Sequence, residues 1–396
     1  MSAGGLLSDP DFRRAAASVA VQGDDREAVA ARAAWTALAE PGDAIAGALV
    51  RLLGAARALD AVHSAVHDGL LPGIPDVSAR ELRAAIDRWA PRLDVALLTS
   101  RTQAAARSRL ALLSPECRLW PARVDDLGDH APLALWVRGE VAAVAGLERA
   151  VALVGARAAT PYGEHLSGTL SAELASTGVP IVSGGAYGID GAAHRAALGA
   201  GGLTVAFVAG GADRVYPAAH AHLFSRIAEQ GAIVSEIPSG GTPTKWRFLQ
   251  RNRLIAAASA ATVVVEAGWR SGSLNTAGHA ATLGRPLGAV PGPVTSATSE
   301  GCHRLLREFD AACITRAQDV RELLGDWSGE ERSGPDRPRP EAIRVLDALA
   351  VRAWRALDDI AQRCGMSLPD VQAQLGLLEL DGRIESSAEG WRLART

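Results

Sequence analysis

Short apolar runs alternate with helical stretches between Val151 and about Gly325, and this alternation restricts the fold more than any other feature of the chain. Buried parallel strands read as nearly continuous apolar runs, and strands separated by helices form a parallel sheet covered on both faces. The pattern therefore predicts an α/β fold with a Rossmann-like doubly wound parallel sheet core, whose ligand site lies at the carboxyl ends of its strands. The runs are VALVG (151–155), PIVSG (180–184), LTVAFVAGG (203–211), AIVSE (232–236), ATVVVEA (261–267) and PLGAV (286–290).

Composition divides the rest of the 396-residue chain around this core. Residues 1–115 are rich in alanine, leucine and arginine, with apolar residues at helical spacing, and predict an N-terminal helical domain without a polar cluster that suggests chemistry. The core is expected over residues 116–325. Proline and polar residues give 326–340 the composition of a linker. Residues 341–396 predict two short helices, a longer helix and a β-wing, which fit a winged-helix domain.

Sequence features also restrict location and cofactors. No apolar run reaches the ~18 residues of a membrane-spanning helix, and the N-terminal residues lack a secretory signal pattern. A cytoplasmic protein without a membrane segment is expected. The segment VGARAATPYG (154–163) departs from GxGxxG, so no nicotinamide cofactor is expected. Four scattered cysteines without a CxxC pair argue against zinc and disulfides, so no metal is expected.

A basic stretch stands out in a chain whose net charge is −3. Residues 237–265 contain four cations and no acidic residue, which gives a local charge of +4. Trp246 and Phe248 alternate with these cations and could stack on bases, a combination typical of single-strand binders. The alternative is that both rings pack inside while the arginines pair with acids elsewhere. The cations are Lys245, Arg247, Arg251 and Arg253.

Glycine-rich turns follow the first two predicted core strands. Arg157 lies on the first turn, where a helix N-terminus would favour a phosphate, although a solvated arginine explains this segment equally well. The second turn, SGGAYGIDGAAH (183–194), allows close approach of the backbone to a ligand. Asp190 and His194 lie four residues apart, and we interpret them as structural rather than catalytic or metal-binding. Ser183 lacks the GxSxG context of a hydrolase nucleophile.

A glutamate and a serine-rich turn follow the fifth predicted strand, in VVVEAGWRSGSLNTAGHA (263–280). Ser271, Gly272, Ser273 and Thr276 could offer donors to a phosphate. Glu266 has two interpretations. It could be the general base of a nucleotide hydrolase, or it could anchor the loop arginines through a partly buried ion pair, and the second is favoured because no matching catalytic partner is nearby.

In combination, these segments resemble the DNA-processing protein A family, also called DprA/Smf. The resemblance runs from roughly Trp120 to Val320 and also rests on WPARVDD (120–126), PLALWVRG (132–139), GAIVSEIPSG (231–240) and FLQRNRLIAA (248–257). It implies a protein that binds and protects single-stranded DNA without catalysis, loads the RecA recombinase during natural transformation, and forms a homodimer. The alternative is a Rossmann-like nucleotide hydrolase that uses Glu266, although the PGGxGTxxE loop of such enzymes is missing.

The resemblance and the charge pattern together give the expected site. By resemblance, Arg157 takes the family's phosphate-binding position and residues 251–253 its RNR motif. No residue is expected to be catalytic, and Asp190, His194 and Glu266 are expected to be structural at the site. The residues expected to contact DNA are Gly155, Arg157, Ser183, Gly184, Gly188, Lys245, Arg247, Phe248, Arg251, Asn252, Arg253, Ser271, Gly272 and Ser273.

Two regions depart from what the resemblance would suggest. Residues 341–396 hold seven arginines and nine acidic residues, a net charge of −2, and the candidate recognition helix SLPDVQAQLGLLEL has no basic residue. Because a helix that enters a DNA groove normally brings basic side chains, a structural or protein-contact role is favoured for this domain. The segment 299–312 has Cys302 and Ala311 where the family has asparagine and glycine, near the presumed dimer surface.

Overall fold

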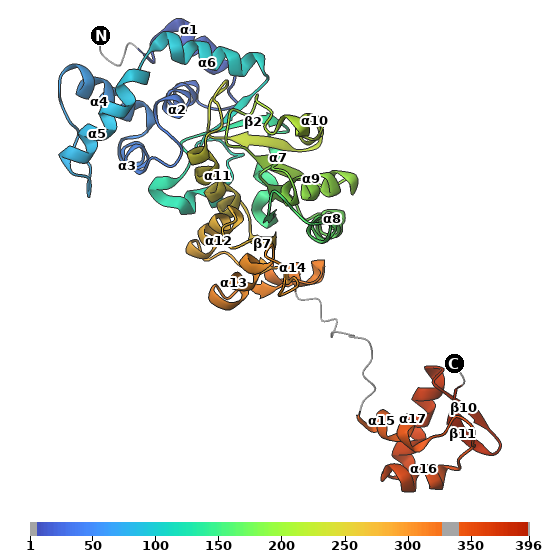
Figure 1. The fold of residues 1–396 in the computed structure, drawn as a ribbon. Helices are drawn as coiled ribbons and strands as arrows, with labels where there is room; N and C mark the ends of the chain where they lie inside the picture. The colour runs from blue at the N-terminus through green and yellow to red at the C-terminus, as the bar shows by residue number, and fades with distance from the viewer. Residues whose placement is uncertain (1–5, 327–339, 395–396) are drawn as a thin grey trace. The chain divides into compact units, whose positions relative to one another are not determined.

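The computed structural model describes residues 6–326 and 340–394 of the chain (Figure 1). The chain divides into two compact units, residues 1–327 and residues 328–396. The N-terminal helices and the sheet share a hydrophobic core within the first unit, and the second unit has a core of its own.

A nine-stranded sheet organises the larger unit, in the order β1-β2-β6-β5-β4-β3-β7-β8-β9. All six predicted strands are present. They are the six central strands of this order, β6-β5-β4-β3-β7-β8, and each is parallel to its neighbours among them. Two antiparallel strands extend one edge and a short parallel strand extends the other, and the apolar runs did not predict these additions. The strands are β1 (Ala111–Leu113), β2 (Leu135–Gly139), β3 (Val151–Gly155), β4 (Ile181–Ser183), β5 (Thr204–Phe207), β6 (Ala232–Ser235), β7 (Ala261–Glu266), β8 (Leu287–Ala289) and β9 (Ala312–Cys313).

Helices cover both faces of this sheet, because side chains along a strand point alternately to opposite faces. In β3, Val151 and Leu153 pack with residues of α8, α9 and α14, whereas Ala152 and Val154 pack with residues of α11, α12 and α13. The doubly wound prediction is thereby confirmed. The helices are α7 (Ala142–Ala145), α8 (Pro161–Ser176), α9 (Ile189–Gly199), α10 (Ala221–Gln230), α11 (Lys245–Ala258), α12 (Ser273–Thr282), α13 (Glu300–Glu308) and α14 (Ala317–Leu323).

Six helices precede the sheet and pack against it beside β2 and α10 (Figure 1). Trp136 of β2 joins the two regions, because its indole Nε1–H donates a hydrogen bond to Thr36 at 3.1 Å. Asp43 caps α3 and also accepts hydrogen bonds from Arg88 and Trp89, which ties α3 to α5. The helices are α1 (Pro10–Ala17), α2 (Arg26–Leu38), α3 (Ala44–Leu53), α4 (Ala55–His67), α5 (Ala79–Trp89) and α6 (Val95–Arg107).

The smaller unit consists of three helices and an antiparallel β-hairpin, as predicted for a winged helix. Val345, Ile360, Val371 and Leu375 are among the residues of its core. Gly365 ends the second helix in the left-handed conformation, which glycine adopts without a steric penalty. The elements are α15 (Pro340–Ala348), α16 (Leu357–Cys364), α17 (Leu368–Leu380), β10 (Ile384–Ser387) and β11 (Gly390–Leu393).

Within the described ranges, no helix combines the length and the apolar character that crossing a membrane requires.

Candidate nucleic-acid interface

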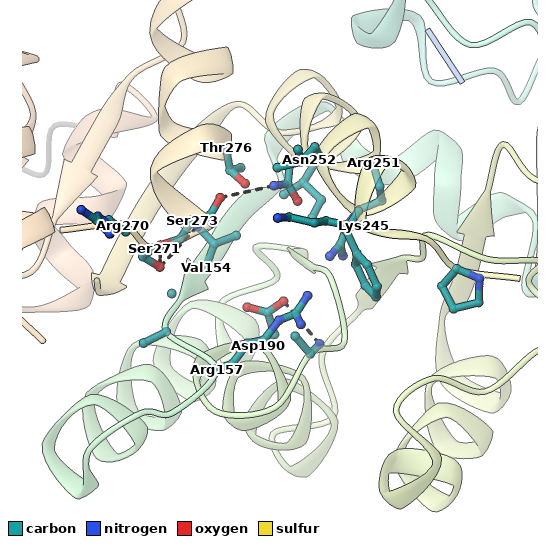
Figure 2. A pocket seen from close by; sticks show the side chains of 18 of the residues that line it. Val154, Arg157, Asp190, Lys245, Arg251, Asn252, Arg270, Ser271, Ser273 and Thr276 are labelled. Carbon is teal, nitrogen blue, oxygen red and sulfur yellow. Dashed lines mark hydrogen bonds between the residues drawn. The ribbon is translucent and has the colours of Figure 1, made fainter. Parts of the chain in front are cut away.

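A cavity of about 790 Å³ opens at the carboxyl ends of β3 and β7, beside the first turns of α11 (Figure 2). The chain continues from β3 to β4 on one side, whereas β7 lies on the other side of β3. Open α/β sheets bind ligands at such a reversal, because the helices that follow the two neighbouring strands leave a crevice between them. The cavity therefore lies where the strand pattern predicted a site.

Most of the residues expected to contact DNA come together around this cavity, although they lie on three separate segments of the chain. Ser183, Gly184, Gly188, Arg247 and Arg253 do not line it. Tyr216, Thr244 and Arg270 line it without having been among the expected residues. The expected residues that do line it are Gly155, Arg157, Lys245, Phe248, Arg251, Asn252, Ser271, Gly272 and Ser273.

Positive charge dominates the cavity. Arg157, Lys245 and Arg270 have exposed side chains, and in the part of the chain that the structure describes none of the three forms an ion pair. Asp190 is the one carboxylate among the described lining residues, and the buried Arg251 lies opposite it. Four cations against one acid leave a net charge of +3, which suits a polyanionic ligand.

An aromatic ring lies among these cations. The guanidinium of Arg157 lies 4.8 Å from the centre of the Phe248 ring, and that of Arg251 lies 5.8 Å from it. The ring of Tyr216, which is 51% exposed, lies 5.6 Å from the Phe248 ring. Trp246 is also exposed but does not line this cavity. The cavity thus offers flat apolar faces beside phosphate-binding cations, the combination that single-strand binders use.

Arg251 is buried at the base of the cavity and is only 6% exposed. Its Nη1 donates to the carbonyl oxygen of Phe207 at the end of β5, at 2.8 Å. Burial lowers the pKa of Arg251 to about 10, against the opposing effect of Asp190. Burial likewise raises the pKa of Asp190, although the charge of Arg251 and the amides of Gly184 and Ala186 favour the carboxylate.

Two glycines of the 183–194 segment are required by close packing rather than by contact with the cavity. A Cβ on Gly184 would lie 1.7 Å from Nη1 of Arg251, so no larger residue fits beside that guanidinium. Gly188 has a φ of +69°, and a Cβ there would lie 2.3 Å from the carbonyl oxygen of Ala156 and 2.6 Å from that of Arg157. The absence of a Cβ at these two positions therefore leaves the space that the Arg251 guanidinium and the Arg157 loop occupy.

The start of α12 forms another wall of the cavity. The hydroxyls of Ser271 and Ser273 lie 2.8 Å apart, and no side chain caps the helix N-terminus. Asn252 orients this turn, because its side-chain amide donates to the carbonyl oxygen of Gly272 at 3.3 Å and to Asn275 at 3.2 Å. The amides of Leu274 and Asn275 donate to the carbonyl oxygens of Ser271 and Gly272, so this turn offers an anion the two serine hydroxyls and the positive end of the helix dipole.

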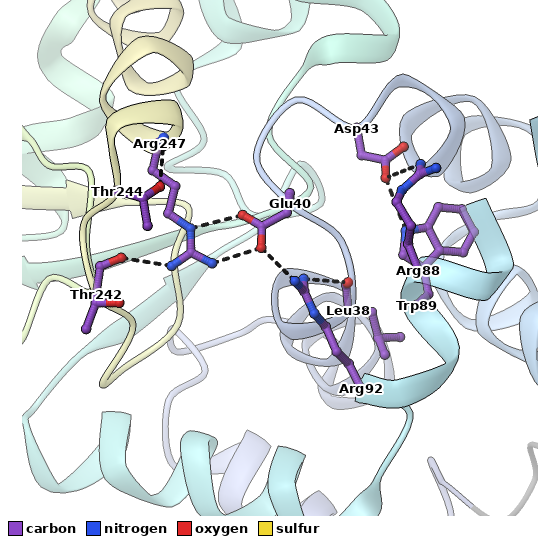
Figure 3. Close-up of polar contacts among 9 residues, drawn as sticks. All are labelled: Leu38, Glu40, Asp43, Arg88, Trp89, Arg92, Thr242, Thr244 and Arg247. Carbon is purple, nitrogen blue, oxygen red and sulfur yellow. Dashed lines mark hydrogen bonds and ion pairs between the residues drawn. The ribbon is translucent and has the colours of Figure 1, made fainter. Parts of the chain in front are cut away.

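Arg253 and Arg247 were expected to contact DNA, and neither of them lines this cavity. Arg253 is 3% exposed and pairs with buried Glu236 at 2.6 Å. Arg247 pairs with Glu40 of the N-terminal region through two hydrogen bonds of 2.9 Å (Figure 3). Both acids lie outside the acid-free stretch, so the alternative interpretation, that its arginines pair with acids elsewhere, holds for these two.

Ser183, also expected to contact DNA, is fully buried, and its hydroxyl donates to the carbonyl oxygen of Leu153 at 2.6 Å. His194 is buried too, with Nδ1 2.7 Å from the hydroxyl of Thr204, and that hydroxyl in turn donates to Ile181. Burial lowers the pKa of His194 to about 3, so the imidazole is neutral. Within residues 6–326 and 340–394, no three His, Cys, Asp or Glu side chains are grouped to hold a metal ion.

Glu266 is buried at the end of β7 and does not line the cavity. Its carboxylate accepts hydrogen bonds from the amide and the hydroxyl of Thr160, both at 2.8 Å, and from the hydroxyl of Thr298 at 2.7 Å. Thr160 is the N-cap of α8 and ends the Arg157 loop. Glu266 thus anchors this loop through threonines, where the sequence analysis favoured an arginine.

Comparison with known proteins adds to this geometry. The model of the family described as DNA recombination-mediator protein A matches residues 111–325, the whole of the sheet. The chain belongs to this family. The model of the DprA winged helix domain matches residues 330–390. Members of the family are thus similar to this chain over the cavity and over the smaller unit.

Individual relatives agree with this assignment. The putative DNA processing protein DprA of Mycobacterium tuberculosis is 42% identical over 392 residues, which cover 91% of this chain and 94% of the relative. The DprA structure from Streptococcus pneumoniae superposes with a TM-score of 0.55 at 34% identity, over 62% of this chain and 83% of that one. A DprA structure from Helicobacter pylori, described for its single-stranded DNA binding mode, superposes with a TM-score of 0.50 at 31% identity. The match covers 55% of this chain and 97% of that one.

The buried pair of Arg253 and Glu236 leads to a first prediction. Arg253→Leu should lower the free energy of unfolding by about 3–5 kcal/mol, because it leaves the Glu236 carboxylate buried without a partner. Adding Glu236→Leu should recover much of this loss, and the double variant should still bind oligonucleotides. Urea denaturation and binding titrations measure both effects. A stable double variant that no longer binds would show that Arg253 acts on DNA directly.

His194 leads to a second prediction, on pH. The unfolded chain protonates His194 below its ordinary pKa of about 6.5, whereas the folded chain does so only near 3. The contribution of the neutral His194 to the free energy of unfolding is therefore fully present well above pH 6.5 and is lost progressively as the pH falls below 6.5. Between pH 7 and 5 this histidine should account for about 2 kcal/mol of lost stability. Urea denaturation of wild type and His194→Gln at both pH values measures this difference, and an equal pH dependence would contradict it.

Proposed function

We propose that this chain binds single-stranded DNA in the cavity between β3 and β7, without base-sequence preference and without cleaving the strand. The observation that carries this proposal is that Arg157, Lys245 and Arg270, which form no ion pair with any described residue, line one cavity together with the Phe248 ring, against which Arg157 lies. Cations supply the sequence-independent part of nucleic-acid affinity. Aromatic faces add stacking that every base can use.

The DprA structure from Helicobacter pylori supports the same ligand, because that protein is described as having a single-stranded DNA binding mode. The polarity of the cavity also supports it. Arg157 and Arg270 lie on loops that follow β3 and β7, and Lys245 opens α11, so the charges surround the cavity from three segments. A strand that crosses the cavity can therefore meet cations on both sides while its bases face Phe248 and Tyr216.

Nucleotide hydrolysis by Glu266 is the competing function. A general base must lie within hydrogen-bond reach of the water that it activates. Glu266 instead accepts three hydrogen bonds from Thr160 and Thr298 and does not line the cavity. Asp190, which does line it, accepts two backbone hydrogen bonds and faces Arg251. These contacts support a binding protein over a hydrolase.

The cellular role that we propose follows from the family resemblance. In this proposal the protein acts in the cytoplasm as a homodimer, protects incoming single strands, and loads the RecA recombinase onto them during natural transformation. The family description, a recombination mediator, supports such a role. The winged helix is proposed to contact protein, because α17 carries no basic residue and exposes Leu377 and Leu380, the latter 86% exposed.

The central prediction concerns Arg157. Arg157→Ala should weaken oligonucleotide binding by about 1.5–3 kcal/mol, the range for hydrogen bonds to charged groups, without loss of fold, because the side chain is exposed. The wild-type affinity should fall steeply as salt rises, because bound phosphates release counterions. Fluorescence anisotropy at two salt concentrations measures both effects. Arg83→Ala, an exposed arginine on α5, is the control and should bind like wild type.

Glu266→Gln separates the two functions. In the binding protein it should lower stability, since Thr160 or Thr298 loses an acceptor, and should weaken binding far less than Arg157→Ala does. In the hydrolase, nucleotide hydrolysis by wild type would vanish in Glu266→Gln, and oligonucleotide binding would be weak in both proteins. That second pattern would overturn the proposal.

Removal of residues 326–396 tests the proposed division of roles. Single-strand affinity should stay within a few fold of that of the full chain, because the cavity is built entirely from residues 154–276 and the removed segment is net acidic. Circular dichroism of the truncated chain verifies its fold. A large loss of affinity in a folded truncated chain would assign DNA contacts to the smaller unit.

A further inference from the structure

A second cavity, of about 410 Å³, lies where the N-terminal helices meet the loop before α11. The two cavities share one segment of the chain: residues 243–245 line the first cavity, and their sequence neighbours Thr242 and Arg247 line the second. The wall of this cavity is largely polar, and it includes Ser239 and the backbone of Gly240 and Gly241. Its occupant must therefore be polar.

Arg92, Arg101 and Arg247 line this second cavity together with one carboxylate, Glu40. Figure 3 shows the contacts of Glu40 with Arg92 and Arg247. Glu40 accepts two hydrogen bonds from Arg247, both at 2.9 Å, and one from Arg92 at 2.8 Å. Arg92 and Arg247 also donate to the carbonyl oxygens of Leu38 and Thr242. Both guanidinium groups are thus fixed in position by the protein.

Arg101 is the third arginine and differs from the other two. It is partly buried, and in the described part of the chain it forms neither a hydrogen bond nor an ion pair. Burial and the positive charges of Arg92 and Arg247 lower the pKa of Arg101. Three cations and one carboxylate leave a net charge of +2 in this cavity. A partly buried cation that is crowded by like charges favours an anion beside it.

We infer that the second cavity binds a backbone phosphate of the same DNA strand, with Arg101 as its main contact, so that the N-terminal helical region extends the single-strand footprint. This inference rests on the proposed function. Guanidinium groups bind phosphate oxygens through their planar set of donors. In sequence, Trp246 lies between Lys245 of the first cavity and Arg247 of the second, and its ring is 57% exposed and therefore accessible to a strand that spans both cavities.

The test compares two lengths of DNA. A short oligonucleotide of about 5 nucleotides can fill the first cavity alone, whereas one of about 20 can reach both, since these lengths bracket the usual site sizes of single-strand binders. The variants are Arg101→Gln, Arg101→Lys, Arg157→Ala and the control Arg83→Gln, all in the full chain. Arg101 makes no hydrogen bond that its loss would break, so the fold should be retained, which the melting temperature verifies.

Arg101→Gln should weaken binding of the long oligonucleotide by about 3- to 10-fold, and should leave the short one unchanged. Loss of one phosphate contact should also reduce the slope of log affinity against log salt by about 0.7 for the long oligonucleotide. Arg101→Lys should retain most of the affinity, because it keeps the charge. Arg83→Gln should bind both lengths like wild type, because its arginine lines neither cavity.

Two outcomes would overturn the inference while the proposed function stands. In the first, Arg157→Ala weakens both lengths but Arg101→Gln binds the long oligonucleotide like the Arg83→Gln control. In the second, Arg101→Gln still binds like the control, and inorganic phosphate raises the melting temperature of wild type but not of Arg101→Gln, so that the cavity holds a free anion. If Arg157→Ala weakens neither length, the proposed function fails and the inference fails with it.

Discussion

The buried guanidinium of Arg251 is the constraint on which the site depends. A cation that is 6% exposed must find its partners within the protein. It donates to the end of β5, faces Asp190 on α9, and lies against the backbone of Gly184 after β4. One side chain of α11 thus fixes the ends of two strands and the start of a helix. The exposed cations of the cavity are arranged around this fixed point.

The sheet could be predicted from the sequence because its central strands are buried on both faces. Runs such as ATVVVEA are apolar at most positions, and that signal is local. The antiparallel strands β1 and β2 were missed because they precede the alternating apolar runs that begin at Val151. β1 has three residues, and its partner is defined only by the tertiary fold.

The strand pattern and the charge pattern predicted where the cavity lies, but not which side chains line it. The differences arise from contacts between residues that are distant in sequence. Charge counting along 237–265 correctly found a basic segment, yet it could not show which cations are neutralised. Glu40 lies 207 residues from Arg247 along the chain, so their pairing is invisible to any local pattern. Tyr216 was missed as a cavity residue because it stands alone in sequence, and Arg270 was missed because it lies outside the basic segment, although it directly precedes the expected Ser271. Glu266 was expected to anchor the loop through arginines, whereas its hydrogen-bond partners in the structure are Thr160 and Thr298.

The two edges of the nine-stranded sheet restrict how copies of this chain can associate. β9 has two residues, and the short edge strand β1 is covered on its outer side by the N-terminal segment, where the amide of Leu112 donates to Val19 at 2.8 Å. Exposed strand edges are templates for pairing with another chain, and neither edge here offers a long one. If two copies of this chain associate, they do so through packed side chains rather than a continuous intermolecular sheet, and such packing leaves the carboxyl edge of each sheet, where the first cavity lies, open to solvent.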